Sequence, residues 1–398
     1  MNLPHRDQVT TLDSPCLRRI CREEIKTFQR IRAAASLSDP FQNPSILSLR
    51  YRILQGVLLS LLSHSWRRVE NTWIFISIQV EMDTPQKIIL ADTKLRTVIA
   101  GWSLKELDAL YFLLHYKSAF PRVISRLFTA ILIKWLQCNL PYLIKNILFV
   151  RQDYYGKSSI IVTLSKFYPL KVIALQHGLM PYKKLGNAKI YPNSRVRIEA
   201  VYNDSYAEKI GLVKPVGSVI YKLGPVIDYR VGLIKGEKSD RMLVFISSGN
   251  LNNSEDVLVI RRLNELSCAV GCQFLVRPHP MERRQAMRDG LSGLQINSEP
   301  KLKFLGRDIS NVILVGFFST LLYEAGNLGF RTVWLTSAKE SQDVPEVTDL
   351  PNVQFASISG LSDEWFLELL KRPLYPVAPN LLYPRIAKMI SEVFPEQA

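Results

Sequence analysis

The sequence predicts an α/β protein made of two units, each a parallel sheet flanked by helices, preceded by a helical N-terminal extension. From about residue 144, apolar runs of strand length alternate with segments of helical spacing. Three such runs end abruptly in polar residues, within Lys171–Gly178, Cys272–Pro280 and Asn311–Gly326. The alternation starts afresh after the polar stretch Lys235–Asp240. Alternating strands and helices are typical of parallel sheets, and the restart indicates a second sheet.

The first third of the chain is predicted to be mainly helical and basic. Apolar spacing predicts several helices, and the strand-like run Asn71–Glu81 is compatible with a hairpin to Lys87–Ala91. The predicted helices are Glu23–Ala35, Leu47–Ser63, Leu104–Lys117 and Arg122–Cys138. No function can be assigned to this region from its sequence.

The next region predicts the first sheet. Its strands are Asn146–Arg151, Lys171–Gln176 and Arg197–Tyr202, and its helices are Ser158–Phe167 and Asp204–Ile210. Asp204 is expected to cap the second of these helices. The stretch Val213–Asp228, rich in Gly, Pro and Val, is interpreted as the transition to the next domain.

The second unit repeats this alternation. Its predicted strands are Met242–Ser247, Gln273–Val276, Val312–Val315 and Arg331–Leu335, with helices Glu255–Val270 and Thr320–Leu328. A last helix, about Tyr383–Val393, is expected to cross back over the first domain. The predicted divisions are residues 1–140, completing the first α/β domain; 141–234, the first α/β domain; 235–380, the second α/β domain; and 381–398, the returning helix.

Composition indicates a folded, basic protein. The 398 residues suffice for two domains, 47% are hydrophobic, and 51 Lys and Arg against 35 Asp and Glu give a net charge of +16. Such an excess favours nucleic acid, anionic lipid or a phosphorylated substrate, or it reflects a basic surface with no dedicated role. No block of like charges is long enough to predict a nucleic-acid-binding tail.

Several sites and segments are absent from the sequence. The five cysteines contain no C-x-x-C pair, and there is no D-x-D, no P-loop and no G-x-G-x-x-G after a strand, so we expect no metal site and no cofactor. Charges within the first twenty residues leave no signal-peptide core. Within Val123–Val150, Arg126, Lys134, Pro141 and Lys145 argue against a spanning helix. Core packing is favoured there, with an anionic membrane face as the alternative.

His177 follows its strand in Q-H-G and is the candidate general base. A neutral imidazole accepts a proton at cellular pH, and Gly178 allows close approach of a substrate. A structural His bonded to a loop is the alternative. Asp153, at the end of an earlier strand, is a rival base, a partner that orients His177, or a residue of a surface turn.

His279 follows the next polar strand end and is a candidate phosphate ligand. Pro278 and Pro280 stiffen its loop, and Arg277 supplies a forked donor suited to phosphate oxygens. The alternative is a rigid turn in which the histidine has no role.

Ser319 and Thr320 are predicted to begin a helix, where free N–H groups and the helix dipole favour an anion. Capping of the helix is the alternative role. Glu324, one turn on, is a candidate for hydrogen bonds from ribose hydroxyls. Ser247 and Ser248 form a second, weaker anion site at another strand end.

The order Q-H-G, R-P-H-P and G-F-F-S-T-L-L-Y-E-A resembles bacterial GT-B transferases that build capsule, lipopolysaccharide or teichoic-acid polymers. CDP-glycerol glycerophosphotransferases and capsular sialyl- and Kdo-transferases are the nearest groups, over roughly residues 144–336. The resemblance implies a GT-B-like fold, two Rossmann-like domains facing across a cleft. It implies that residues 141–234, completed by 1–140, form the acceptor domain and that residues 235–380 form the nucleotide-donor domain. It also implies phosphate binding by His279, Pro280, Ser319 and Thr320, and a base at His177. The match of Asp153 to the acidic residue of the sialyltransferases is loose.

The expected function is therefore metal-independent transfer of a sugar or polyol phosphate from a nucleotide-activated donor to a glycan or lipid-linked glycan. CMP- or CDP-linked donors are expected ahead of UDP-linked ones, with the enzyme in the cytoplasm or peripheral on the inner face of the cell membrane. No nucleic acid is expected as a partner. The alternatives are a nucleotide-sugar epimerase of the same fold and a non-catalytic basic nucleic-acid-binding protein.

Overall fold

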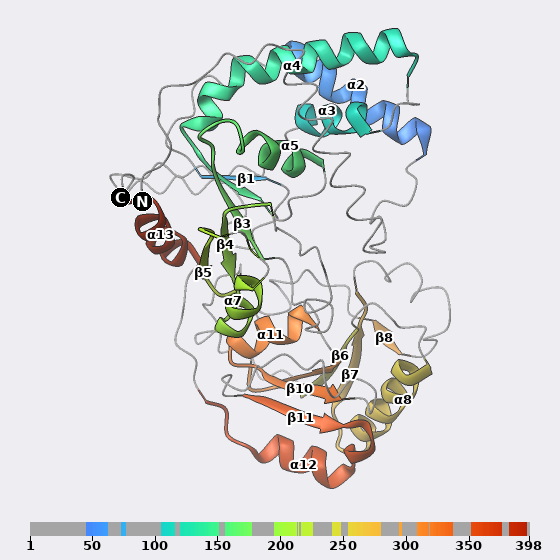
Figure 1. Cartoon of the computed structure of the whole chain (residues 1–398). Helices are drawn as coiled ribbons and strands as arrows, with labels where there is room; N and C mark the ends of the chain where they lie inside the picture. The colour runs from blue at the N-terminus through green and yellow to red at the C-terminus, as the bar shows by residue number, and fades with distance from the viewer. Residues whose placement is uncertain are drawn as a thin grey trace. The chain divides into compact units, whose positions relative to one another are not determined.

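The chain forms two compact units, one holding the described residues up to Gly224 and the other those from Pro225 onward (Figure 1). The computed structural model describes residues 45–62, 73–76, 105–115, 120–150, 156–176, 195–212, 214, 216–225, 241–247, 254–279, 294–296, 309–317, 319–336, 352–375 and 382–395. The predicted helix Glu23–Ala35, the predicted strand Lys87–Ala91 and the predicted domain division after residue 234 lie outside these residues.

The first unit contains a five-stranded parallel sheet in the order β1-β2-β3-β4-β5. The strands are Trp73–Ile76, Ile147–Val150, Lys171–Leu175, Ile198–Val201 and Val219–Lys222. The three strands predicted after residue 144 are confirmed. β1 pairs in parallel with β2, Trp73 lying opposite Ile147, so the first third of the chain contributes an edge of this sheet.

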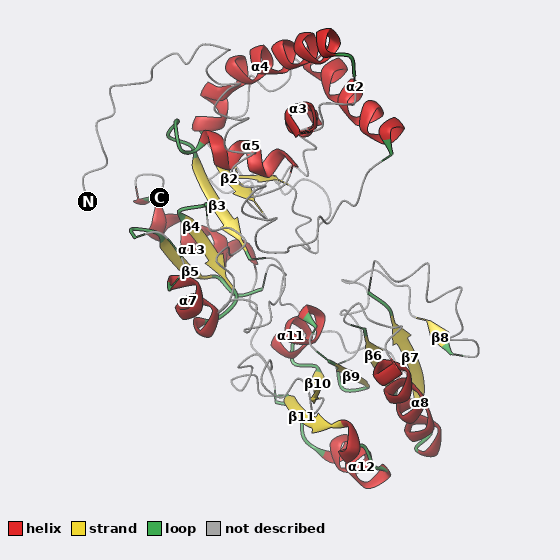
Figure 2. Cartoon of the chain, turned by 45° about the vertical axis from the view of Figure 1, so that its right-hand side comes forward, coloured by secondary structure: helices red, strands yellow, loops and turns green. Residues whose placement is uncertain are grey.

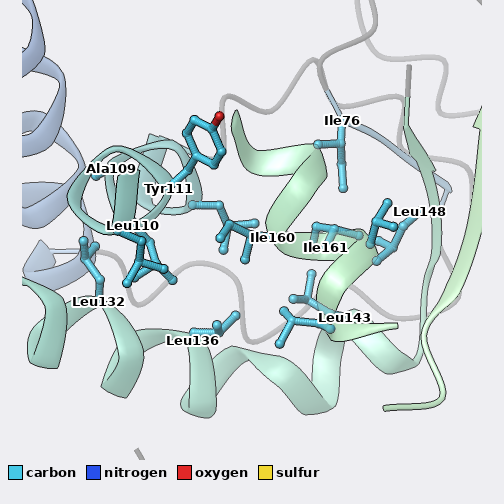
Figure 3. Packing of buried hydrophobic residues seen from close by; sticks show 14 of the residues in the cluster. Ile76, Ala109, Leu110, Tyr111, Leu132, Leu136, Leu143, Leu148, Ile160 and Ile161 are labelled. Atoms are coloured by element: carbon cyan, nitrogen blue, oxygen red, sulfur yellow. The ribbon is translucent and has the colours of Figure 1, made fainter. Parts of the chain in front are cut away.

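Helices from the first third of the chain supply much of the first unit's core. The helices of this unit are α2 (Ile46–Leu62), α3 (Lys105–His115), α4 (Arg122–Ile144), α5 (Gly156–Leu164) and α7 (Asp204–Gly211). In Figure 3, Leu110 of α3, Leu136 of α4 and Ile160 of α5 converge. On the sheet, Ile76 and Leu148 belong to the same cluster. Alternate strand residues face these helices, as the period of a strand requires.

Helix α4 is longer than the sequence predicts, because it continues through Pro141. Pro141 is exposed three residues before the end of α4, so only a short part of the helix follows it. Among the described helices, α4 alone is long and apolar enough to cross a bilayer by length and composition. However, Leu132, Leu136 and Leu143 are buried in the core of the first unit, so α4 serves as a core helix.

Two details of the first unit correct the sequence prediction. Helix α7 is capped by Asn203 rather than Asp204: the Asn203 side chain accepts the N–H of Tyr206 at 2.9 Å, and Asp204 pairs with Lys222 instead. The stretch Val213–Asp228 was expected to be a transition, but it contains β5, which pairs with β4 along its whole length. The transition between the two units therefore begins only after β5.

The second unit contains a six-stranded parallel sheet in the order β11-β10-β9-β6-β7-β8. In chain order the strands β6 to β11 are Met242–Ile246, Gln273–Arg277, Gln295–Ile296, Val312–Gly316, Arg331–Thr336 and Val353–Ser357. The helices are α8 (Ser254–Ala269), α11 (Thr320–Asn327), a 3-10 turn η3 (Ile358–Gly360), α12 (Asp363–Lys371) and α13 (Leu382–Val393). Four strands and three helices were predicted; β8, β11 and α12 were not.

Helices cover this sheet, which explains its uniformly apolar central strands. Residues of α8 and α12, among them Leu263 and Phe366, pack with alternate strand residues such as Phe245 and Val315. Figure 2 shows both helices beside the sheet. The intervening residues, such as Val244, are also fully buried. Strands buried on both faces need continuous apolar runs, and β6 and β9 have them.

Candidate functional site

The strand order of the second unit reverses beside β6. From β6 the chain passes to β7 and β8 on one side, and then to β9, β10 and β11 on the other. Counted from β6, this is the order 3-2-1-4-5-6 of dinucleotide-binding sheets, in which ligands bind at the carboxyl ends of the strands where the order reverses. The reversal lies between β6 and β9, so the residues that follow these strands are the first candidates for a site.

Ser247 follows β6 and is held against the end of β7. Its backbone N–H donates to the carbonyl of Arg277 at 3.0 Å, and the residue is 2% exposed. In the register of the sheet, Ile246 lies opposite Arg277 on one side and Gly316 on the other. Ser247, Arg277 and Gly316 therefore end three adjacent strands at nearly the same level.

The junction of β6 and β9 requires the glycine at 316. A Cβ at this position would lie 2.5 Å from the carbonyl oxygen of Ile246 and 3.3 Å from Leu322 of α11. No side chain fits at such distances from a backbone atom. Gly316 thus allows the strand and the following helix to approach β6 closely, in the same way that glycines do in nucleotide-binding turns.

Ser319 occupies the N-cap position of α11 but does not cap the helix. Its backbone is extended, with φ −142° and ψ 131°, and its side chain makes no capping hydrogen bond. Two other N-cap residues of this protein behave differently: Asn203 accepts a backbone N–H of α7, and Ser362 accepts the N–H of Trp365 at 3.2 Å. The capping alternative for Ser319 is therefore not realised, and the positive end of the α11 dipole is not neutralised by this side chain.

The remaining described candidates lie nearby in the fold. Thr320 begins α11 and is half-buried, and Glu324, one turn later on the same helix, is 3% exposed. Arg277 ends β7 and is 6% exposed, whereas His279, two residues further on, is partly exposed. The second unit thus combines a buried guanidinium, a more accessible imidazole and a helix N-terminus at the carboxyl side of one sheet. Such groups suit a phosphate.

In the first unit, the residue that precedes His177 is fixed by hydrogen bonds. The N–H of Gln176 donates to the carbonyl of Ala200 at 2.9 Å, and its side-chain oxygen accepts the N–H of Tyr202 at 2.8 Å. Gln176 is 4% exposed and joins the ends of β3 and β4. This anchoring role was not predicted, although a glutamine that ends an apolar strand is a recognisable signal for it.

Four predicted site residues, His177, Asp153, Ser248 and Pro280, lie outside the described residues. Their roles stay predictions. Across the described part of the chain, no three His, Cys, Asp or Glu side chains gather in a group able to hold a metal ion.

Comparison with known proteins gives the fold. No family model matches the sequence, and no curated protein matches it. UDP-GlcNAc 2-epimerase from Neisseria meningitidis, solved with UDP-GlcNAc bound, matches 82% of this chain and 99% of its own with a TM-score of 0.50 and 14% identity. The chain has the GT-B fold.

Two further solved structures are similar to the GT-B chain at lower scores. UDP-GlcNAc 2-epimerase from Methanocaldococcus jannaschii matches 62% of this chain and 75% of its own, with a TM-score of 0.46 and 12% identity. The wall teichoic acid polymerase TagF matches 94% of this chain and 91% of its own, with a TM-score of 0.40 and 11% identity. The GT-B fold class implied by the sequence resemblance is confirmed by the match to the Neisseria meningitidis structure.

Proposed function

We propose that this GT-B chain is a metal-independent transferase that moves a sugar, or a polyol phosphate, from a nucleotide-activated donor to a surface glycan. The acceptor is a glycan or a lipid-linked glycan of the capsule or lipopolysaccharide kind. The enzyme acts in the cytoplasm, which agrees with five cysteines that form no recognisable disulfide framework.

One observation carries the proposal. The N-terminus of α11, with a serine that does not cap it, follows β9 directly beside the reversal of strand order. A helix N-terminus at this place favours a diphosphate, and backbone N–H groups together with two hydroxyls supply the donors. Arg277 and His279, at the end of β7, supply cationic or polar groups on the other side of β6.

The proposed chemistry divides between the two units. Ser319, Thr320, Arg277 and His279 stabilise the negative charge that develops on the departing nucleotide phosphate, which replaces the usual role of a divalent cation. Glu324 binds the ribose hydroxyls. His177, from the first unit, removes the proton of the acceptor hydroxyl, and Asp153 orients it.

A second candidate function is epimerisation of a nucleotide sugar. The matched Neisseria meningitidis protein is an epimerase, and its fold agrees with this chain over most of both lengths. An epimerase needs acidic residues for proton transfer at carbon, and the described strand ends of the first unit offer mainly Gln176, Asn203 and Asp204. Asp204 is engaged with Lys222. We therefore rank the transferase first.

The decisive experiment supplies CMP-, CDP- and UDP-linked donors with and without a glycan acceptor, and measures both the free nucleotide and the stereochemistry of the recovered donor. We expect nucleotide release that depends on the acceptor and persists in EDTA. His177→Ala and His279→Ala should both lose turnover, and Ser362→Ala, a matched serine substitution at the N-cap of α12, should keep it.

Other outcomes would overturn the proposal. An epimerised donor without acceptor would establish the second function. Unchanged rates in both histidine variants would remove the proposed site. Nucleic-acid binding with no nucleotide released from any donor would favour the non-catalytic alternative.

A further inference from the structure

Helix α2 is apolar on both of its sides. Its inner side, with Leu49, Ile53 and Val57, is buried in the core of the first unit. Its outer side carries a stripe of large apolar residues at alternating spacings of four and three, and these are between 42% and 78% exposed: Leu47, Tyr51, Leu54, Leu58 and Leu61. Burying the inner side explains why the helix packs, but it does not explain the outer stripe.

The beginning of α4 continues this surface. Val123, Ile124 and Leu127, in its first two turns, are exposed. Helices α2 and α4 lie side by side in the first unit (Figure 1). The guanidinium of Arg50 on α2 stacks 5.7 Å from the ring of Phe120, just before α4. The two exposed apolar stripes therefore meet at this corner, and together they form what we call the α2–α4 surface.

The charges of the α2–α4 surface have one sign. Neither helix contains an aspartate or a glutamate, over 17 residues of α2 and 23 of α4. Four exposed basic side chains accompany the apolar stripes: Arg50, Arg122, Arg126 and Lys134. Arg52 lies on another side of α2, over the ring of Phe112 of α3. Apolar side chains flanked by arginines and lysines, without acids, are typical of helices that lie in the interface of an anionic membrane.

We propose that the α2–α4 surface docks the protein on an anionic lipid bilayer, with both helices lying in the plane of the interface. The leucines of the stripes enter the boundary of the acyl chains, and the arginines contact the phosphates of the headgroups. This assignment stands independently of the proposed catalytic function, because the site of the second unit shares no residue with it.

Charge favours an anionic bilayer over two other partners that could cover the α2–α4 surface, namely a second copy of the chain and the segment of residues 1–44. A second copy of the chain would bring four basic side chains against four more, with no acid on either α2 or α4 to compensate. The segment of residues 1–44 carries seven basic and five acidic side chains, so it also has the same sign of net charge as the surface. An anionic lipid surface attracts all four cations at once.

The test is cosedimentation of the full chain with vesicles of phosphatidylcholine alone or with 30 mol% phosphatidylglycerol, roughly the anionic content that gives a bilayer a strong surface potential. We expect binding to the anionic vesicles that weakens in high salt. Leu54→Glu with Leu58→Glu should abolish binding. Arg122→Gln with Arg126→Gln should weaken it roughly tenfold to thirtyfold. Both pairs are exposed, so thermal unfolding should stay close to that of the parent protein.

The matched control is Leu258→Glu, an equally exposed leucine on α8 of the second unit, which should bind vesicles like the parent. Equal binding by the double leucine variant and the parent would overturn the proposal. So would a parent dimer that the same variant converts to monomer, or a gain of binding on removal of residues 1–44, since these outcomes assign the surface to another occupant. Donor turnover in solution should be unchanged in all these variants, which separates this test from that of the catalytic site.

Discussion

Serines 319 and 362 occupy the same position at the start of two helices, yet only one of them caps its helix. Ser362 accepts the N–H of Trp365, whereas the side chain of Ser319 makes no capping bond. The same residue type thus caps its helix in one place and makes no capping bond in the other. At the scale of single residues, this difference is the basis for the proposed phosphate site at Ser319.

We therefore predict opposite effects for the two alanine substitutions. Ser362→Ala should lower the free energy of unfolding by about 1 kcal/mol, because a capping bond is lost. Ser319→Ala should change it by less than about 0.5 kcal/mol but weaken donor binding about tenfold, because a hydrogen bond to a charged phosphate is lost. Denaturant unfolding and donor titration measure the two quantities. Equal stability losses with unchanged donor affinity would contradict the assignment.

Gly316 provides a second test at this scale. Gly316→Ala should destabilise the protein by about 1–3 kcal/mol, because the new methyl group meets the carbonyl of Ile246. The control is Gly211→Ala at the end of α7, where the nearest atom is a flexible side-chain end 3.7 Å away. This change should be neutral or slightly stabilising. Denaturant midpoints compare the two, and equal losses would show that the approach of β9 and α11 to β6 is not the cause.

At the scale of elements, helices α3 and α5 are joined by a carboxylate. Asp108 of α3 accepts the N–H of Lys157 at the start of α5 at 2.9 Å, where the helix dipole favours a negative charge. Burial nevertheless raises the pKa of Asp108 above its ordinary value, and the nearby Lys157 only partly offsets this. A side chain of α3 thus accepts a free N–H at the start of α5, which the local sequence of α5 does not reveal.

The raised pKa predicts how stability depends on pH. The folded state holds the proton of Asp108 more tightly than the unfolded chain, so its contribution is complete below the ordinary pKa of 3.8 and is lost as pH rises through the raised value. Asp108→Asn keeps the acceptor oxygen without the charge. It should be more stable than the parent near pH 7, with the advantage vanishing below about pH 4. The side chain is 32% exposed, so the effect should be small.

The control for this experiment is Asp363→Asn, in the exposed first turn of α12. It removes a charge that favours the helix dipole and should slightly destabilise the protein near pH 7. The free energy of unfolding of each variant is measured over a series of pH values. A lower free energy of unfolding for Asp108→Asn than for the parent protein at neutral pH would contradict the interpretation.

At the scale of the whole molecule, the described residues of the proposed donor site all belong to the second unit, while the strand that leads to His177 belongs to the first. Binding of a nucleotide should therefore depend on the second unit alone. A donor nucleotide at a hundredfold excess over its Kd should stabilise the folded chain by about 2.7 kcal/mol, seen as a rise in Tm. His279→Ala should lose this rise and His177→Ala should keep it. Loss in both variants would contradict the division of roles.

The sequence predicted the elements better than their arrangement. Strands with continuous apolar runs, such as β6 and β9, were predicted because burial on both faces demands such residues. Three strands were not predicted from the sequence: the two-residue β8, the more polar β5 and the edge strand β11. Pairing with neighbouring strands, rather than amino-acid composition, makes these segments strands. Asn203 rather than Asp204 caps α7 for a similar reason, because either residue suits the position by type.

Local sequence is sufficient to predict the α/β class, the polar ends of the strands and the residue types suited to a phosphate, because apolar periodicity and side-chain chemistry are local properties. Only the tertiary structure decided that β6 lies between β7 and β9, so that Ser247, Arg277 and Gly316 end adjacent strands. It also decided that Ser319 leaves its helix uncapped and that α2 turns leucines outward. These features depend on hydrogen bonds and packing between residues far apart in the chain, which no local pattern specifies.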